Sequence, residues 1–169
     1  MKMRLTAFLC LIVFSCWIGG CQRACKDVSC LNGGKCSNGQ CRCTGRWSGT
    51  NCDTLCPIGW EGKYCATPSS LKFIRTWQAT TTSTATGTVY HTLTITQGSF
   101  IQDLVISNFN GEGFTVHASI LDYNSFEILP QNATGSYTGP VEGSGYLNGD
   151  NLAVNLTKGG VDYFANCNK

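Results

Sequence analysis

Eight of the twelve cysteines of this chain lie between Cys25 and Cys65. This stretch has few apolar residues besides its aromatic side chains, so it cannot build an ordinary hydrophobic core. Segments of about forty residues are usually stabilised by disulfides or by a metal ion instead. The paired CxxC or CxxH units of structural zinc sites are absent from the sequence. We therefore expect disulfides, and no metal site, in this stretch.

The N-terminal residues predict export. A short basic start is followed by the apolar run Leu5–Trp17, which is too short to span a bilayer but suits the core of a signal peptide. The next residues, Ile18–Cys21, resemble the lipobox of bacterial lipoproteins. That resemblance implies a signal peptide at 1–20 and a lipidated N-terminus at 21–24, with diacylglycerol and palmitate-type acyl chains on Cys21 as the membrane anchor. The alternative is ordinary cleavage near Gly20, which leaves Cys21 as a disulfide partner.

The spacing of the cysteines resembles that of EGF-like modules. The family's order is found in Cys25-x4-Cys30-x5-Cys36-x4-Cys41-x-Cys43-x8-Cys52, with Asn32-Gly33-Gly34 as its turn and Asn38-Gly39 as the expected tip of its hairpin. The family's closing loop, CPxGWxGxxC, recurs at 56–65. The resemblance implies the pairs Cys25–Cys36, Cys30–Cys41, Cys43–Cys52 and, as in laminin-type modules, Cys56–Cys65. Without the resemblance, six cysteines allow fifteen pairings.

The EGF-like module, residues 25–65, is interpreted as a rigid spacer. Calcium-binding relatives carry acidic residues before the first cysteine, where this chain has Gln22-Arg23-Ala24. The alternative is that the module binds a partner through the aromatic residues Trp47, Trp60 and Tyr64.

Residues 71–169 follow a short polar linker at 66–70 and predict an all-β domain. Within 87–97, Val89, His91, Leu93 and Ile95 alternate with polar residues, as in a strand with one buried face. Turn residues separate similar runs, so we expect an antiparallel up-and-down β-barrel, or a sandwich, of about eight strands. The expected strands are 71–82, 87–97, 101–108, 113–121, 125–129, 134–139, 142–147 and 151–158, with a ninth at 161–167.

Two further resemblances bear on the whole chain. Residues 72–79 resemble the strand that opens calycin or lipocalin-like barrels. A lipobox, one EGF-like module and a β-domain together resemble small lipoproteins of Bacteroidetes. This implies a cell-envelope protein of the outer membrane, on either its periplasmic or its surface face.

The residues of the β-domain give no catalytic motif. His91 alternates with apolar residues and is expected in the core or barrel lumen, where it is a possible binding residue, whereas His117 falls on the polar face. We expect no enzyme activity and no cofactor. Cys167 is expected to be a buried thiol or, alternatively, an intermolecular disulfide partner.

These features support one leading hypothesis and two alternatives. The leading hypothesis is a lipid-anchored envelope protein whose EGF-like spacer displays the β-domain for binding a protein or a glycan. The alternatives are a carrier of a small apolar ligand in the barrel lumen and an uncharacterised enzyme. The net charge of +2 is too small for the dense basic face of a nucleic-acid-binding protein, so no nucleic acid partner is expected.

Overall fold

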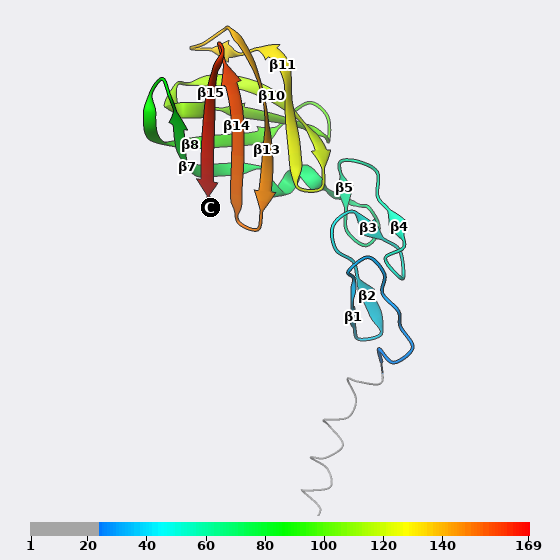
Figure 1. The fold of residues 1–169 in the computed structure, drawn as a ribbon. Coiled ribbons are helices and arrows are strands. Elements are labelled where there is room, and N and C mark those ends of the chain that lie inside the picture. Colours follow the sequence, from blue (N-terminus) through cyan, green and yellow to red (C-terminus); the bar gives the residue numbers. More distant parts are fainter. Residues whose placement is uncertain (1–23) are drawn as a thin grey trace, which may run out of the picture. The chain divides into compact units, whose positions relative to one another are not determined.

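The computed structural model describes residues 24–169 (Figure 1). The expected signal peptide and the lipidation site Cys21 therefore lie outside the described residues. The chain divides into two compact units, one reaching to Cys56 and including Gly62–Cys65, the other made of Pro57–Glu61 and Ala66–Lys169. Within residues 24–169, no helix is long and apolar enough to cross a membrane.

The first unit is held together by disulfides. They join Cys25 to Cys36, Cys30 to Cys41, Cys43 to Cys52 and Cys56 to Cys65, which are the pairs that the EGF-like resemblance implies. Strands β1 (Lys35–Ser37) and β2 (Gln40–Arg42) form a hairpin. Its tip is Asn38-Gly39, where both residues have positive φ. Strand β3 (Trp47–Ser48) pairs with β4 (Thr54–Leu55).

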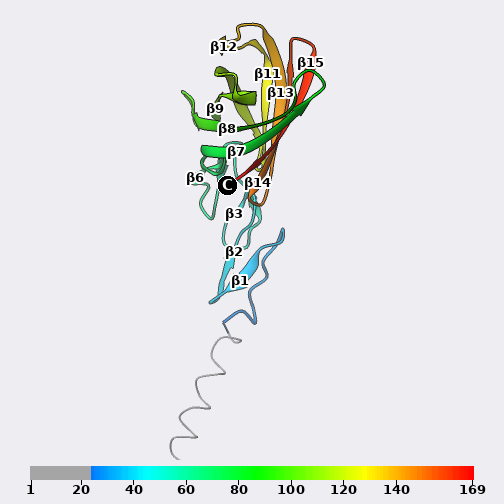
Figure 2. The same cartoon turned by 90° about the vertical axis from the view of Figure 1, so that its left-hand side faces the viewer.

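The second unit contains a closed eight-stranded antiparallel barrel. Its strands, in chain order, are β7 (Arg75–Ser83), β8 (Gly87–Gln97), β9 (Asp103–Ser107), β10 (Phe114–Asp122), β11 (Ser125–Asn132), β13 (Pro140–Asn148), β14 (Asn151–Lys158) and β15 (Val161–Asn168). Each strand pairs with the next, and β15 pairs with β7 from Tyr163↔Ser83 to Asn168↔Gln78. The predicted up-and-down barrel is thus confirmed, in its closed form. In Figure 1, β13–β15 run upright in front of β7 and β8, and Figure 2 shows these strands from the side.

Large apolar side chains fill the barrel. Phe73, Trp77, Phe114 and Phe126 are all fully buried. The Trp77 indole Nε1 donates a hydrogen bond to the Phe73 carbonyl over 2.9 Å, and the Phe73 and Phe126 rings meet edge to face at 5.4 Å. Burial of each such side chain contributes about 1.5–3 kcal/mol. A filled interior is what eight strands allow when no large ligand is enclosed.

Residues 66–70, expected to be a linker, instead belong to the barrel unit. Strand β6 (Thr67–Pro68) pairs with β5 (Trp60–Glu61), and the 3-10 helix η1 (Ser69–Lys72) follows. The Ser70 carbonyl accepts the N–H groups of Phe73 and Ile74, which turns the chain before β7 begins at Arg75. The expected strand 71–82 therefore starts too early.

The expected strand 134–139 is also wrong over most of its length. Only β12 (Thr134–Gly135) is extended there, and it pairs with β10. Gly135 has a φ of +100°, and the Ala133 N–H donates to the Gly139 carbonyl across a turn. This turn lets the Tyr137 ring pack against Phe114, with their centroids 5.9 Å apart.

Candidate functional site

Outward-facing side chains in the middle of β8, β7, β15, β14 and β13 form a surface without charge, and the next outward positions on β13 and β15 are the acidic Glu142 and Asp162. Strand register places the uncharged side chains in three rows, which together are named the hydroxyl–amide face. The first row is Thr88, Thr82, Phe164, Asn155 and Ser144. The second row is Tyr90, Thr80, Asn166, Ala153 and Tyr146. The third row is Thr92, Gln78, Asn168, Asn151 and Asn148.

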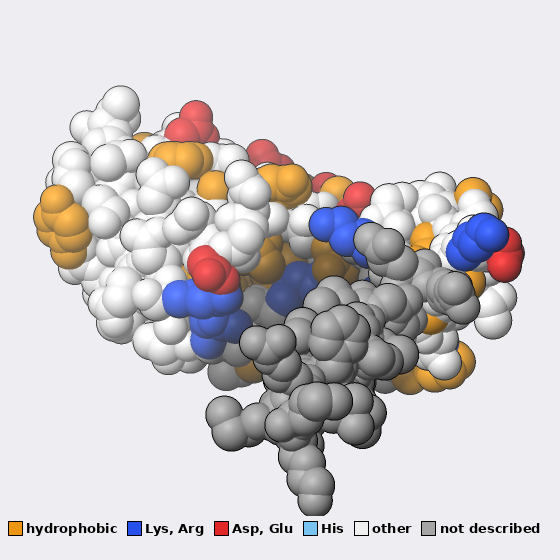
Figure 3. Space-filling view, turned by 90° about the horizontal axis from the view of Figure 1, so that it is seen from below, with side chains coloured by type: hydrophobic (Ala, Val, Ile, Leu, Met, Phe, Trp, Pro, Cys, Tyr) orange, Lys and Arg blue, Asp and Glu red, His pale blue; other side chains and the backbone are white. Residues whose placement is uncertain are grey.

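The local sequence explains why these side chains share one face. Successive strand residues point to opposite faces, so the alternation that buries Tyr163, Ala165 and Cys167 turns Phe164 and Asn166 outward. Threonine suits exposed strand positions because its branched side chain packs well on a pleated surface. In Figure 3, backbone and side chains that are neither charged nor apolar, drawn in white, cover much of the barrel surface seen from below.

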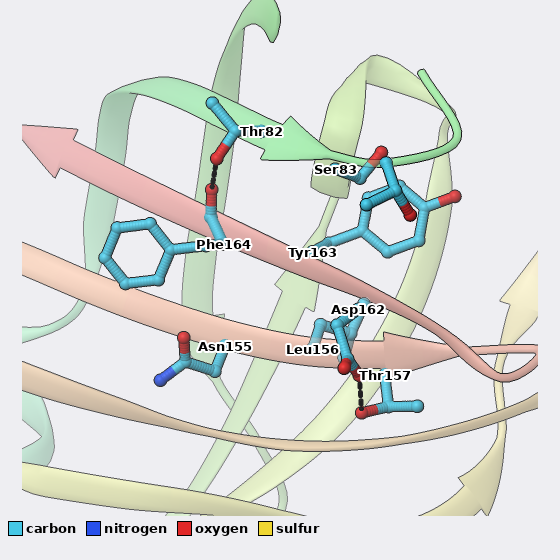
Figure 4. Close-up of a pocket in the computed structure, with 9 residues that line it drawn as sticks. Thr82, Ser83, Asn155, Leu156, Thr157, Asp162, Tyr163 and Phe164 are labelled. Atoms are coloured by element: carbon cyan, nitrogen blue, oxygen red, sulfur yellow. Dashed lines mark hydrogen bonds between the residues drawn. The ribbon is translucent and has the colours of Figure 1, made fainter. Parts of the chain in front are cut away.

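A groove of about 530 Å³ is hollowed into this part of the barrel (Figure 4). It is lined by Thr82, Ser83, Thr84, Asn155, Leu156, Thr157, Asp162, Tyr163 and Phe164. Three strands contribute, because β7 and β14 flank β15 on either side. The groove therefore exists only when the first and last strands of the barrel have paired.

The side chains of this groove offer three kinds of contact. The Phe164 ring, 40% exposed, supplies an apolar surface and lies directly across the strand pair from the Asn155 amide. The Thr82 hydroxyl donates to the Phe164 carbonyl over 3.4 Å. Thr157 donates its hydroxyl to Asp162 Oδ1 over 2.7 Å, which orients the carboxylate (Figure 4). A ring, an amide and an oriented acceptor in one hollow suit a ligand with both C–H and hydroxyl groups.

A second groove, of about 300 Å³, adjoins the first at Thr157. It is lined by Pro130, Gln131, Pro140, Val141, Glu142, Thr157, Gly159 and Gly160. The first hollow thus lies over β14 and β15, the second lies toward β13, and Thr157 on β14 borders both.

The aromatic residues that the sequence suggested for partner binding belong to two different units. Trp60 belongs to the barrel unit, whereas Trp47 and Tyr64 belong to the disulfide-rich unit. Both tryptophans are half-buried, and Tyr64 is exposed with the Lys63 ammonium 5.1 Å from its ring centroid. The structure defines no shared surface for the three.

His91 faces the barrel interior, as its alternation predicts, and is half-buried. Its Nε2 accepts the Asn110 N–H over 3.0 Å, so the neutral ring carries its proton on Nδ1. Burial lowers the pKa of His91, against a hydrogen bond to the Val89 backbone that raises it. His91 thus holds the turn that contains Asn110 and lies outside both grooves. His117 is exposed on the outer face, as expected.

The side chain of Lys158 lies in a box of aromatic rings. Lys158 is ion-paired with Glu112, and its ammonium lies 5.4, 5.0 and 5.2 Å from the ring centroids of Phe114, Tyr137 and Tyr163. Burial alone would raise the pKa of Glu112. Hydrogen bonds to Lys158 and Asn110, together with the Lys158 charge, outweigh burial and hold this pKa below its ordinary value. This box anchors the β14–β15 hairpin, whose Thr157 and Asp162 line the first groove.

Cys167 is a buried cysteine without a disulfide partner among the described residues. Burial raises the pKa of its thiol to about 12. This agrees with the expectation of a buried core thiol. Among residues 24–169, no group of three or more His, Cys, Asp or Glu side chains is arranged to hold a metal ion.

The groove residues Phe164, Asn155, Thr82 and Asp162 were missed by sequence reasoning. Their signal was present in part, because the alternation along 161–167 leaves Phe164 as an aromatic residue on the wet face. Sequence alone does not show that Asn155 and Thr82 lie across from it.

Comparisons with known proteins identify no relative with a known function. No family model matches the sequence, and no curated protein matches it. Among solved structures, a redesigned β-barrel is similar, with 14% sequence identity and a TM-score of 0.46, covering 60% of this chain and 94% of that chain. The closed barrel of this chain rests on its own strand register.

Proposed function

We propose that this chain is a lipid-anchored protein of the bacterial outer membrane whose barrel binds glycans at the hydroxyl–amide face. One observation carries the proposal: the Phe164 ring, the Asn155 amide and the Asp162 carboxylate line one groove at the edge of the hydroxyl–amide face. Sugars present apolar C–H faces and a rim of hydroxyl groups. They therefore need an aromatic surface and neutral hydrogen-bonding groups side by side.

The composition of the face supports a glycan over a protein as the partner. Protein interfaces are enriched in aromatic residues, Met and Arg at their buried centre. The hydroxyl–amide face has no Arg or Met, and its aromatic residues Tyr90, Phe164 and Tyr146 are separated by Thr, Ser, Asn and Gln side chains. Hydroxyl and amide groups both donate and accept hydrogen bonds, which matches the rim of a sugar.

The filled interior supports binding at the outer surface over carriage of an apolar ligand. Trp77, Phe73, Phe114 and Phe126 occupy the lumen with none of their surface exposed. A lipid-sized guest would have to displace these side chains, at a cost of several kcal/mol in lost burial.

The anchoring part of the proposal rests on the sequence. The lipobox-like Ile18–Cys21 supports attachment to a membrane through Cys21, and the EGF-like spacing of 25–65 supports a stiff connector. Mass spectrometry of the N-terminal peptide tests the anchor. Acyl chains on Cys21 are expected, and an unmodified cysteine there would refute lipidation.

Glycan binding is tested with the full chain in detergent on an array that holds neutral and anionic glycans. Phe164→Ala should weaken binding of any array hit about fivefold, since an aromatic contact contributes about 1 kcal/mol. Phe100→Ala is the matched control, because Phe100 is 74% exposed and lines neither groove. No bound glycan, or equal binding by Phe164→Ala and the wild type, would contradict the proposal.

A further inference from the structure

Two carboxylates flank the point where the two grooves meet. Strand register places Glu142 on β13 opposite Thr157 on β14, and Thr157 opposite Asp162 on β15. Directly opposed side chains have Cβ atoms about 5 Å apart, so the carboxylates stand on either side of the Thr157 hydroxyl. Asp162 lines the first groove, Glu142 lines the second, and Thr157 lines both.

These carboxylates set the charge of the grooves. Asp162 is the acidic residue among those that line the first groove, Glu142 is the acidic residue of the second, and neither lining contains Lys, Arg or His. The neighbouring cation, Lys158, is ion-paired with Glu112 and enclosed by aromatic rings, so its charge is already compensated. Both carboxylates belong to exposed residues, so they are available to a ligand.

The Asp162 carboxylate is prepared to accept hydrogen bonds. Thr157 occupies Oδ1 at 2.7 Å and fixes the group, which leaves the second oxygen as an acceptor. An ionised carboxylate accepts hydrogen bonds and donates none, so it suits a sugar hydroxyl. A sulfate or uronate brought to the same place would meet a like charge within a few ångströms.

We infer that the two grooves form one extended site for uncharged oligosaccharides, from which Asp162 and Glu142 exclude anionic glycans. This inference rests on the proposed glycan binding and adds its substrate class. Since the grooves adjoin at Thr157, an oligosaccharide can occupy both, whereas a single sugar fills one. Binding should therefore increase with chain length as well as depend on charge.

The test uses the full chain and three probes: a neutral glucan oligosaccharide, the same oligosaccharide oxidised to uronates at its primary alcohols, and glucose. The wild type should bind the neutral oligosaccharide at least about tenfold more tightly than its uronate form, and more tightly than glucose. The Asp162→Asn/Glu142→Gln variant should lose most of the preference for the neutral form. A higher salt concentration should also reduce the wild-type preference for the neutral oligosaccharide, because exposed charges are screened.

A matched control removes two negative charges elsewhere. Asp103→Asn/Glu127→Gln changes outer-face residues that line neither groove, and it should keep the wild-type preference. Equal wild-type binding of the neutral and uronate forms would overturn the exclusion of anionic glycans while leaving glycan binding intact. Binding of neither form by a folded protein, together with an array without hits, would overturn the proposed function and this inference with it.

Discussion

The Lys158 box gives the sharpest prediction about stability. In Lys158→Met, the side chain is one atom shorter and keeps apolar contact with Phe114, Tyr137 and Tyr163 but loses its charge. The lost cation–π contacts are worth roughly 0.5–2 kcal/mol. Lys158 and Glu112 side chains are 13% and 31% exposed, so the lost ion pair costs less than the 3–5 kcal/mol typical of a fully buried pair.

The expected destabilisation by Lys158→Met is therefore about 2–3 kcal/mol, or roughly 10 °C in Tm. Urea unfolding of the full chain, followed by tryptophan fluorescence, measures it, since Trp77 is fully buried in the barrel. A double-mutant cycle with Glu112→Gln isolates the pair and should show coupling of about 1 kcal/mol or more. A loss below about 0.5 kcal/mol, or strictly additive effects, would refute the reasoning.

Three further outcomes are expected. Gly145→Ala should destabilise the barrel by about 1–3 kcal/mol, because its Cβ would lie 2.1 Å from the Phe126 ring, while the outward Ser144→Ala should have little effect in the same unfolding assay. The lowered pKa of His91 predicts that the contribution of this residue to stability is complete above about pH 6.5 and falls at lower pH, because the unfolded chain then binds a proton that the folded ring resists. His91→Gln should flatten the dependence of stability on pH below that value, and an unchanged dependence would contradict the prediction. Cys167, whose thiol pKa is raised to about 12, should resist alkylation at pH 8 in the native protein and react after unfolding, as read by mass spectrometry; rapid native labelling would contradict its burial.

Local pattern was sufficient to predict many of the strands. Alternation alone gave 87–97 and 151–158, the bounds that β8 and β14 have in the structure. It failed at 71–74, where Leu71, Phe73 and Ile74 look like part of a strand. There the Ser70 carbonyl accepts hydrogen bonds from the N–H groups of Phe73 and Ile74, which turns the chain. Phe73 is therefore part of a turn and not of a strand, although its side chain is buried in the core.

Closure of the barrel and the groove could not be predicted in the same way. Both depend on pairing between β7 and β15, which are far apart in the sequence. A shift of one residue in that register would turn Phe164 inward and Tyr163 outward. The requirement for glycine at 143 and 145 could not be predicted from the sequence either. It arises because a side chain there would collide with the Asn155 carbonyl and the Phe126 ring on the neighbouring strands.

The most direct test of glycan binding at the hydroxyl–amide face is an NMR titration of the isotope-labelled full chain in detergent. The probe is a neutral glucan oligosaccharide. Amide shifts should concentrate at Phe164, Asn155, Thr157 and Asp162. Phe164→Ala should require a several-fold higher oligosaccharide concentration for the same shifts, whereas Phe100→Ala should titrate like the wild type. Shifts centred on Trp47 and Tyr64, or on the interior residues Trp77 and His91, would contradict the account.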